Sequence, residues 1–386
     1  MVDSIHVLHV SDTHLGYRQY GLYEREADIY RVFSEVIEYA IKEHVDVVVH
    51  AGDFFDTVRP PPQAILTAIE GLSRLKEHGI PFVAIMGDHD TPKRRLAPPL
   101  VILERIGLVR LVAVRGERSL KLRTRSGELL VAGVRNYRRI DAPALRAELA
   151  ALSRRSGGEP SVFLFHQCVK GVCPQYEVDP IHLPQGYSYY AGGHVHVYRE
   201  MRVHGNLLVY PGSIDYMRVD EVKEGEPKYV VLAEVTAKSA SVQRIRLRSV
   251  RPQLYIETTA KNVADAVRRV LSRTHGKPLL HIRVKGGEAE RKHVVRLLEK
   301  LLAGRVLYYT LTYEAVTGRL GGVDAAQEIR VIDRVELLKT LLKDERLARL
   351  ADELINLLSS GRSINEAVKL IDEVYGLREL RGEGGG

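Results

Sequence analysis

Five short apolar runs, each followed by aspartate, histidine or glycine, constrain the fold of this chain more than any other feature. Each run is about five residues long and rich in valine, isoleucine and aromatic residues, which is typical of a buried strand. The runs occupy residues 5–10, 45–49, 81–86, 162–165 and 189–191. In open α/β sheets, ligands collect outside the carboxyl ends of the strands. We therefore expect the polar residues after the five runs to converge on one site.

Seven of these polar residues have side chains that bind metals: Asp12, His14, Asp53, Asp88, His166, His194 and His196. A mixture of imidazole and carboxylate suits Mn²⁺, Fe²⁺, Zn²⁺ or Co²⁺ better than Mg²⁺ or Ca²⁺, which prefer oxygen ligands. Seven ligands are too many for one ion, but they suit two ions about 3.5–4 Å apart that share a bridging carboxylate. Phosphoester hydrolysis is the natural reaction of such a site.

An ester oxygen that leaves during hydrolysis needs a proton. His89 lies between two acidic residues in the stretch Gly87-Asp-His-Asp90. We therefore predict that His89 is the general acid of the reaction. The alternative is that its imidazole has a structural role or binds a metal.

The stretches between the apolar runs indicate the fold. Apolar residues recur at helical spacing over 24–42 and 62–78, between the first three runs. Such strand–helix–strand units predict a parallel sheet with right-handed crossovers. Residues 110–250 have a mostly β character, with one helix predicted at 142–152. We expect residues 1–250 to form a sandwiched α/β domain to which both halves supply ligands.

Length and composition set broad limits. The chain has 386 residues, enough for two or three domains. No apolar run approaches the roughly 20 residues needed to span a bilayer, and the first residues lack the form of a signal peptide. We therefore expect a cytoplasmic protein without a membrane partner. The two cysteines, Cys168 and Cys173, are expected to be packed or free thiols, with metal or redox roles as the alternative.

Residues 251–317 are predicted to form a small basic domain of pattern β-α-β-α-β. The predicted strands are 253–257, 279–284 and 306–312, and the predicted helices are 263–273 and 289–302. Residues 251–313 hold thirteen Lys and Arg against five Asp and Glu, an excess of eight that equals the net charge of +8 of the whole chain. This concentration favours contact with nucleic acid, and solvated helix faces are the alternative.

In the remainder of the chain, residues 331–376 are predicted to bind a partner. Residues 318–330 have the composition of a linker, 331–376 are rich in leucine at helical spacing, and 377–386 are expected to be disordered. Two helices in 331–376, the second starting at the capping box Ser363-Ile-Asn-Glu366, cannot bury so many leucines in each other. A groove on a partner is the expected destination, and packing against the chain's own body is the alternative.

The order of these motifs resembles the calcineurin-like metallophosphoesterases. The motifs are Asp12-x-His14, Gly52-Asp53, Gly87-x-His89-Asp90, His166 and Gly193-His194-x-His196. A narrower resemblance is to the nuclease subunit of the double-strand-break repair complex, the meiotic-recombination-eleven family with its bacterial counterpart SbcD. It is carried by Asp12-Thr-His-Leu-Gly16, Gly52-Asp-Phe-Phe-Asp-Thr57, the prolines at 60–62 and Tyr210-Pro-Gly-Ser213. It is specific over 5–215, topological over 251–313 and compositional beyond.

The resemblance implies a fold and a set of residue roles. The fold is an α/β metallophosphoesterase sandwich, with mixed sheets flanked by helices, a small α+β cap domain and a C-terminal helical hairpin. One metal would be held by Asp12, His14 and His196, and the other by Asp88, His166 and His194. Asp53 would bridge the two metals, and His89 would be the catalytic histidine. The DNA-binding candidates are Tyr17, Arg18, Lys93, Arg94 and Arg95.

The resemblance also implies an activity and partners. The activity is manganese-dependent exonuclease and endonuclease cleavage, with two Mn²⁺ per chain, at double-stranded DNA ends and on single-stranded DNA. The partners are a second copy, joined through the helices at 62–78 and 100–106, and an ABC-type coiled-coil ATPase (SbcC-like) bound by 331–376.

One departure from the family concerns Asp88, because the family usually has Asn before the catalytic histidine. An aspartate can ligate equally well, but it changes the charge of the site. Two other functions stay open. One is a phosphodiesterase or phosphatase for small substrates, which the basic domain and the leucine-rich region disfavour. The other is a subunit that tethers DNA ends with an impaired site, which only Asp88 favours.

Overall fold

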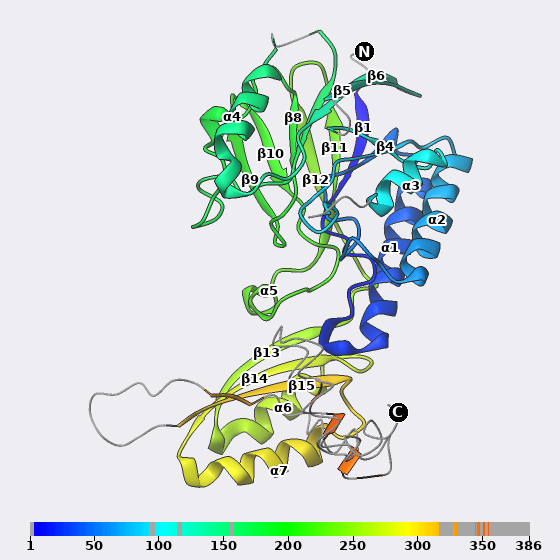
Figure 1. Ribbon diagram of the computed structural model, residues 1–386. Coiled ribbons are helices and arrows are strands. Elements are labelled where there is room, and N and C mark those ends of the chain that lie inside the picture. The colour runs from blue at the N-terminus through cyan, green and yellow to red at the C-terminus, as the bar shows by residue number, and fades with distance from the viewer. Residues whose placement is uncertain are drawn as a thin grey trace, which may run out of the picture. The chain divides into compact units, whose positions relative to one another are not determined.

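The computed structural model describes residues 4–92, 97–113, 118–154, 158–315 and 327–329, together with isolated residues between 344 and 354. The chain divides into two compact units, Met1–Gln253 and Leu254–Gly386. Figure 1 shows both units, and each is described by itself. The predicted helical region 331–376 lies largely outside the described residues, and the predicted tail 377–386 lies outside them entirely.

The first sheet of unit 1 contains three of the five predicted strands. Its order is β12-β11-β1-β2-β3-β4. The four strands β1 to β4 run parallel, and β11 pairs with β1 in the antiparallel sense. The bounds are β1 (Ile5–Val10), β2 (Val47–His50), β3 (Phe82–Ala84), β4 (Arg110–Leu111), β11 (Tyr229–Val235) and β12 (Ala240–Arg246).

The second sheet contains the other two predicted strands. Its order is β5-β6-β7-β8-β10-β9, with β6, β7, β8 and β10 parallel and the two edge strands antiparallel to their neighbours. The bounds are β5 (Ser119–Thr124), β6 (Gly127–Gly133), β7 (Ser161–Phe165), β8 (Tyr189–Gly192), β9 (Arg199–Val203) and β10 (Asn206–Tyr210).

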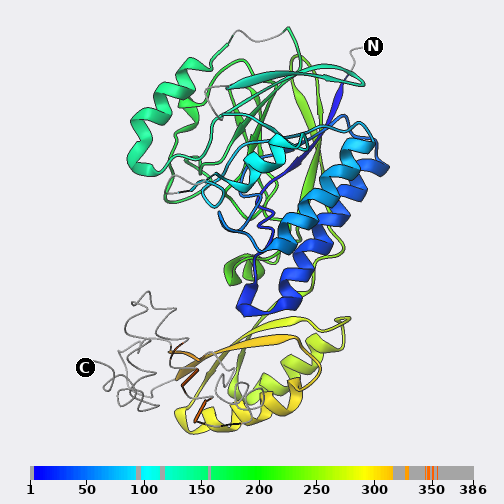
Figure 2. The ribbon, with the colours of Figure 1, turned by 45° about the vertical axis from the view of Figure 1, so that its right-hand side comes forward.

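Helices cover the outer face of each sheet. In Figure 2, α1 (Tyr23–Lys42) and α2 (Pro62–Glu77) lie side by side along the first sheet. With α3 (Pro99–Arg105) they lie on one side of unit 1, and α4 (Ala142–Ala151) lies on the other. The predicted helix start at Pro62 is confirmed by the bounds of α2. A proline is tolerated in the first turn of a helix because its missing N–H has no partner there. The short helix α5 (Val219–Glu224) follows the second sheet in the chain.

The core of unit 1 is layered in the same way. Along β1, Leu8 packs in the cluster beneath α1 and α2, whereas its neighbour Val7 packs in the cluster between the two sheets. A third cluster lies on the other face of the second sheet and includes Leu145 of α4. Successive residues of a strand point to opposite faces, so an inner strand that is apolar throughout buries both faces. The predicted sandwich of mixed sheets flanked by helices is therefore confirmed.

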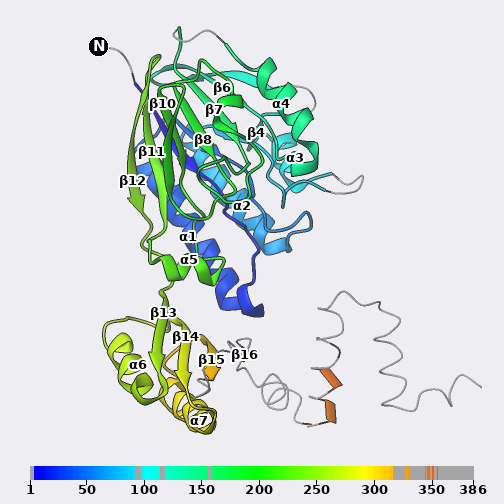
Figure 3. The ribbon, with the colours of Figure 1, turned by 90° about the vertical axis from the view of Figure 1, so that its left-hand side faces the viewer.

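Unit 2 is a sheet with helices on one face, as Figure 3 shows. The sheet order is β13-β14-β15-β16, with β14 and β15 parallel. Alternate apolar residues of the strands pack with the inner faces of the helices in one cluster that includes Ile282 and Leu298. The bounds are β13 (Gln253–Thr259), α6 (Val263–Leu271), β14 (Leu279–Gly286), α7 (Arg291–Leu302), β15 (Tyr308–Ala315) and β16 (Gln327–Ile329). Single 3₁₀ turns lie at Gln19–Gly21, Arg139–Asp141, Pro180–His182, Ala260–Asn262 and Glu288–Glu290.

Two expectations from the sequence need correction. Residues 327–329, assigned to a linker, form β16, which pairs with β15 in the antiparallel sense and satisfies its edge. Cys168 and Cys173, expected to be packed or free thiols, form a disulfide. The loop between them turns back on itself through a bridge between Lys170 and Cys173, which brings the two sulfurs together. No helix in the described part of the chain is long and apolar enough to cross a membrane.

Candidate metal centre

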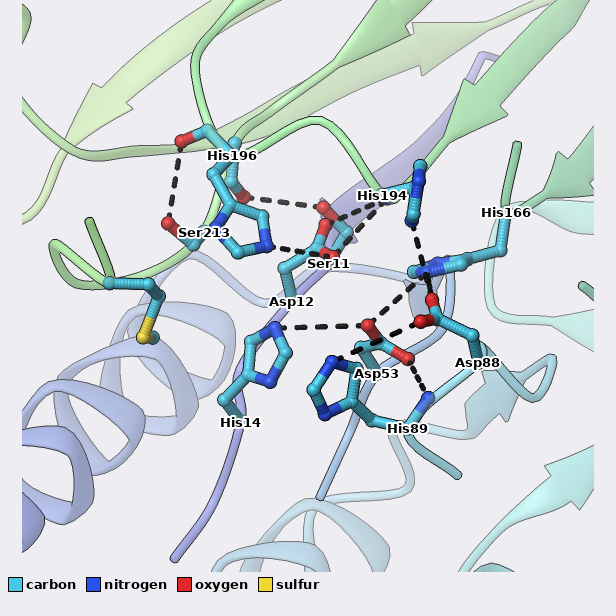
Figure 4. A network of polar contacts seen from close by, with 12 residues as sticks. Ser11, Asp12, His14, Asp53, Asp88, His89, His166, His194, His196 and Ser213 are labelled. Atoms are coloured by element: carbon cyan, nitrogen blue, oxygen red, sulfur yellow. Dashed lines mark hydrogen bonds and ion pairs between the residues drawn. The ribbon is translucent and has the colours of Figure 1, made fainter. Parts of the chain in front are cut away.

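The structure brings the seven predicted ligands together at the carboxyl ends of five strands (Figure 4). Asp12 and His14 follow β1, and Asp53 and Asp88 follow β2 and β3. His166 follows β7, and the loop after β8 supplies the last two histidines. Four groups of three possible ligand atoms lie within 4.8 Å of one another: Asp12, His14 and His196; Asp88, His166 and His194; Asp12, Asp53 and His166; and His14, Asp53 and His89.

Strained backbone turns these side chains into the site. Asp12, His14, Asp53 and His194 have positive φ angles of 51°, 44°, 55° and 86°. Residues other than glycine seldom adopt this region, and such strain concentrates at functional sites. Each of these residues follows a buried strand, so the positive φ bends the chain sharply where the strand ends.

Two glycines allow the loops to approach one another. A Cβ atom at Gly87 would overlap the Asp53 carboxylate, and one at Gly193 would overlap the carbonyl of Ala51 and crowd the ring of His166. Only glycine leaves room for these contacts. The Gly-Asp and Gly-His endings seen in the sequence therefore have a packing cause.

Asp53 lies between the two outer groups of ligands. Its Oδ2 atom is 3.3 Å from His166 Nε2 and 3.8 Å from His14 Nε2, while Oδ1 accepts a hydrogen bond from the backbone N–H of His89 at 2.9 Å. Burial opposes ionisation, but His166 and His14 outweigh it and hold the pKa of the Asp53 carboxyl well below its ordinary value. Asp53 is therefore an ionised carboxylate that both groups can share.

The group formed by Asp12, His14 and His196 is the more enclosed one. Asp12 is buried and accepts the His194 backbone N–H at 3.1 and 3.2 Å, and His196 Nε2 is 3.8 Å from Asp12 Oδ1. His14 is also buried, and its Nε2 atom has no hydrogen-bond partner within the part of the chain that the structure describes. Burial lowers the pKa of His14, but Asp56, Asp53 and Asp12 together raise it to about 9. A buried imidazole nitrogen facing carboxylates without a hydrogen bond suits a bound cation.

The group formed by Asp88, His166 and His194 is more open. Asp88 Oδ1 lies 3.1 Å from His166 Nε2 and 3.3 Å from His194 Nδ1, and the side chains of Asp88 and His194 are 43% and 36% exposed. His166 is buried, and its Nδ1 donates to the carbonyl of Ala51 at 2.7 Å, which directs Nε2 toward the carboxylates. Burial opposes charge on Asp88, but His166 and His194 lower the pKa of its carboxyl below the ordinary value. These donors also fit a divalent cation.

His89 lies beside both groups at the open side of the site. Its ring packs edge-on against His14, with 4.8 Å between the centroids, and its side chain is 44% exposed. The Nδ1 atom donates to the carbonyl of Asp56 at 2.6 Å, so Nε2 is free of that bond and lies 3.9 Å from Asp88 Oδ2. This orientation suits a proton donor, but the group with His14 and Asp53 leaves the ligand alternative open.

The sequence reasoning missed four residues that support the site. Asp90 accepts hydrogen bonds from the backbone N–H groups of Phe54, Phe55 and Gly87, and so joins two of the ligand loops. Asp90 and Asp56 both lie within the sequence motifs, but the pattern alone assigns neither of them a role. Glu221 Oε1 lies 3.0 Å from His196 Nδ1, and Lys228 pairs with Glu221. Glu221 lies in α5 and Lys228 directly precedes β11, both beyond the last motif, so no local pattern marks them.

Two of the five predicted DNA-binding residues, Tyr17 and Arg18, are described by the structure, and their contacts lie outside this cluster. The Tyr17 hydroxyl donates to the carbonyl of Met217 at 3.3 Å, and Arg18 Nε donates to Glu26 at 2.7 Å. The Arg18 guanidinium also lies 3.8 Å from the centroid of the Tyr23 ring. Both side chains are engaged within the protein. The other candidates, Lys93, Arg94 and Arg95, lie outside the described residues.

Comparisons with known proteins agree with this geometry. Residues 5–198 match the calcineurin-like phosphoesterase family. The chain is 32% identical over 391 residues to a protein of Saccharolobus solfataricus called DNA double-strand break repair protein Mre11, covering 96% of this chain and 99% of that one. Proteins with the same name are 35% identical in Sulfurisphaera tokodaii, covering 76% and 77%, and 32% identical in Thermoplasma acidophilum, covering 96% and 98%. The chain therefore belongs to the calcineurin-like phosphoesterases and, within them, to the Mre11 family of DNA double-strand break repair proteins.

Proposed function

We propose that this chain is a DNA nuclease that processes the ends of double-strand breaks with two Mn²⁺ ions. As a member of its family it is a metal-dependent phosphodiesterase. The observation that carries the proposal is the position of Asp53, a buried ionised carboxylate between two groups of ligands. It lies close to Nε2 of His14, for which the described residues supply no hydrogen-bond partner. Such a cluster is costly to bury unless cations bind there.

The two ions would take different sets of ligands. Asp12, His14 and His196 would hold the first ion, and Asp88, His166 and His194 the second. Asp53 would contribute to both. The mixed nitrogen and oxygen donors suit Mn²⁺. When bound, two such ions neutralise charge on a phosphoryl group and lower the pKa of an attacking water.

His89 would donate a proton to the leaving oxygen. Its Nδ1 is fixed by the carbonyl of Asp56, and its exposed ring can reach a substrate through Nε2. With Nδ1 committed as a donor, Nε2 is the atom that gains and loses the proton. In this proposal the seven ligands bind the metals, and His89 protonates the leaving oxygen.

The charge of unit 2 favours DNA over a small substrate. Exposed basic side chains lie on both of its helices, including Arg269 and Arg273 near the end of α6 and Lys292, Arg296 and Lys300 on α7. A phosphatase for small esters does not need such a surface, whereas a protein that contacts DNA phosphates does. Replacing Lys292, Arg296 and Lys300 by glutamate should weaken binding to duplex DNA and reduce its dependence on salt.

Two assemblies belong to the proposal. Three large apolar side chains are half-exposed on α2 and α3: Leu66, Ile102 and Ile106. They support a homodimer joined through these helices, so Ile102→Glu should give a monomer in analytical ultracentrifugation. The leucine-rich residues 331–376 would bind an ABC-type coiled-coil ATPase, and their deletion should abolish co-elution with it.

One assay separates this function from its alternatives. Linear duplex DNA and a small phosphodiester are each incubated with the chain and Mn²⁺, with and without a chelator. A nuclease cleaves the DNA with Mn²⁺ but not after the chelator is added. A small-substrate phosphodiesterase cleaves only the small ester. A tethering subunit binds the DNA ends and cleaves neither substrate. Either of the last two results would contradict the proposal.

A further inference from the structure

We infer that Glu221 and Lys228 are positioning residues that hold His196 in the orientation that binds the first ion. The inference rests on the proposed metal assignment, but it concerns side chains outside the ligand set. Both side chains are buried in unit 1, with exposures of 5% for Glu221 and 3% for Lys228. A buried pair of charges has a desolvation cost and seldom stabilises a fold by itself.

Glu221 reaches the far side of the His196 ring. Its Oε1 atom accepts a hydrogen bond from His196 Nδ1 at 3.0 Å. A carboxylate accepts only, so Nδ1 carries the proton and the lone pair of the neutral ring is on Nε2. That nitrogen faces Asp12, 3.8 Å from Oδ1. Partners of this kind orient ligand histidines and raise their basicity.

Lys228 fixes both Glu221 and the backbone of His196. Its Nζ atom is 2.5 Å from Glu221 Oε2, donates to the His196 carbonyl at 2.8 Å and to Ser213 Oγ at 2.9 Å. The lysine therefore ties the side-chain partner of His196 to the main chain of the same residue. It also balances the charge of Glu221, so the pair changes the orientation of the ligand more than the net charge of the site.

The arrangement differs from that of His166, whose Nδ1 donates to the backbone carbonyl of Ala51. That contact cannot be removed by substituting a side chain, whereas the contact to His196 can. The exposed Glu224, on the same helix α5, provides a matched control. It pairs with Arg199 at 2.8 Å on the surface.

The test compares three variants of the full chain. The double variant Glu221→Leu with Lys228→Met removes both buried charges together, so neither is left unpaired. The glutamine variant, Glu221→Gln with Lys228→Met, keeps an oxygen that can accept from Nδ1 without leaving a lone buried charge, and Glu224→Leu is the control. Manganese binding is measured by calorimetry, and thermal melting checks that each variant is folded. We expect the double variant to bind one of the two ions 10- to 100-fold more weakly, roughly the loss known for outer partners of metal ligands. In the double variant, the affinity for the other ion should stay within a few-fold of the native value. In the glutamine variant and in the control, the affinities for both ions should stay within a few-fold of the native values.

A second measurement needs no metal. In the metal-free chain labelled with ¹⁵N-histidine, NMR at alkaline pH should report the Nδ1–H tautomer of His196 in the native chain and in the glutamine variant, and the Nε2–H tautomer in the double variant. Retention of the Nδ1–H tautomer in the double variant, unchanged affinity for both ions, or equal weakening of both would overturn the inference. A native chain that binds no Mn²⁺ would instead overturn the proposed function, and the tautomers would still decide the role of Glu221 and Lys228.

Discussion

The two proposed metal positions are built from similar side chains but differ in enclosure. Around the first, Asp12 and His14 are buried and His196 is mostly so, whereas at the second, Asp88 and His194 are partly open to solvent and only His166 is buried. The two positions meet at Asp53. From this difference in enclosure we expect chemically similar ligands to hold the two ions with unequal strength.

The contacts behind the ligands differ in the same direction. At the first position, His14 Nδ1 lies 3.2 Å from an oxygen of Asp56, and His196 contacts Glu221. At the second, His166 Nδ1 contacts a backbone carbonyl, and the carboxylate of Asp88 lies close to both His166 and His194. We expect the first ion to bind more tightly and exchange more slowly, and the second to depend strongly on Asp88.

Among the ligands assigned to one position only, the largest effect is expected from loss of Asp12. Asp12→Ala should remove the first ion and lower kcat for DNA cleavage by at least roughly a thousandfold, because a bound metal contributes several kcal/mol to transition-state stabilisation. It should also lower the melting temperature, since the backbone N–H of His194 loses its acceptor. Asp12→Asn, which keeps the acceptor, should recover stability but not activity. A kcat for DNA cleavage by Asp12→Ala within tenfold of the native value would contradict the first metal position.

His89 belongs to neither position in the proposed assignment. His89→Gln should lower kcat by roughly 10²- to 10⁴-fold, the usual contribution of a general acid, while both ions and DNA still bind. Calorimetry and single-turnover cleavage measure the two quantities separately. Loss of an ion in this variant would make His89 a ligand with His14 and Asp53. The proposed assignment of ligands to the two positions would then be wrong.

A smaller effect is expected from Asp88→Asn, which keeps a ligand oxygen but removes a charge. The pKa of the Asp88 carboxyl is lowered by His166 and His194 against the effect of burial, so the group is ionised at neutral pH. The asparagine should weaken the second ion by roughly tenfold and leave the first unchanged. At saturating metal, the less negative site should also move the alkaline-rising limb of the pH–rate profile to lower pH. Equal affinities with superimposable profiles would show that a neighbour, such as charged His89, cancels the carboxylate.

The remaining prediction concerns stability and metal removal. An ion that binds only the native state, at a free concentration 100 times its dissociation constant, raises the free energy of unfolding by about 2.7 kcal/mol. The native chain should gain two such increments from Mn²⁺, and Asp88→Ala should gain only one. Urea unfolding with Mn²⁺ and with EDTA measures the difference. Two full increments in the variant would show that Asp88 does not hold an ion.

The sequence predicted the side chains at strand ends and missed those that support them. Parallel strands share one carboxyl edge, so apolar runs followed by aspartate or histidine were enough to bring Asp12, Asp53 and His166 together. Glu221 and Lys228 could not be found in this way, because their roles depend on the contacts that α5 and the residue before β11 make with His196 in the loop after β8. The disulfide and β16 were missed for a related reason: each depends on a reversal of the chain that no local motif marks.

The two proposed metal positions form one site only if Asp53 contributes to both. The most direct test counts Mn²⁺ ions bound per chain in the native protein and in Asp53→Ala, by calorimetry with elemental analysis of the dialysed complexes. The account predicts two ions in the native chain and, in the variant, loss of both together with loss of DNA cleavage. Two ions retained by Asp53→Ala would contradict it.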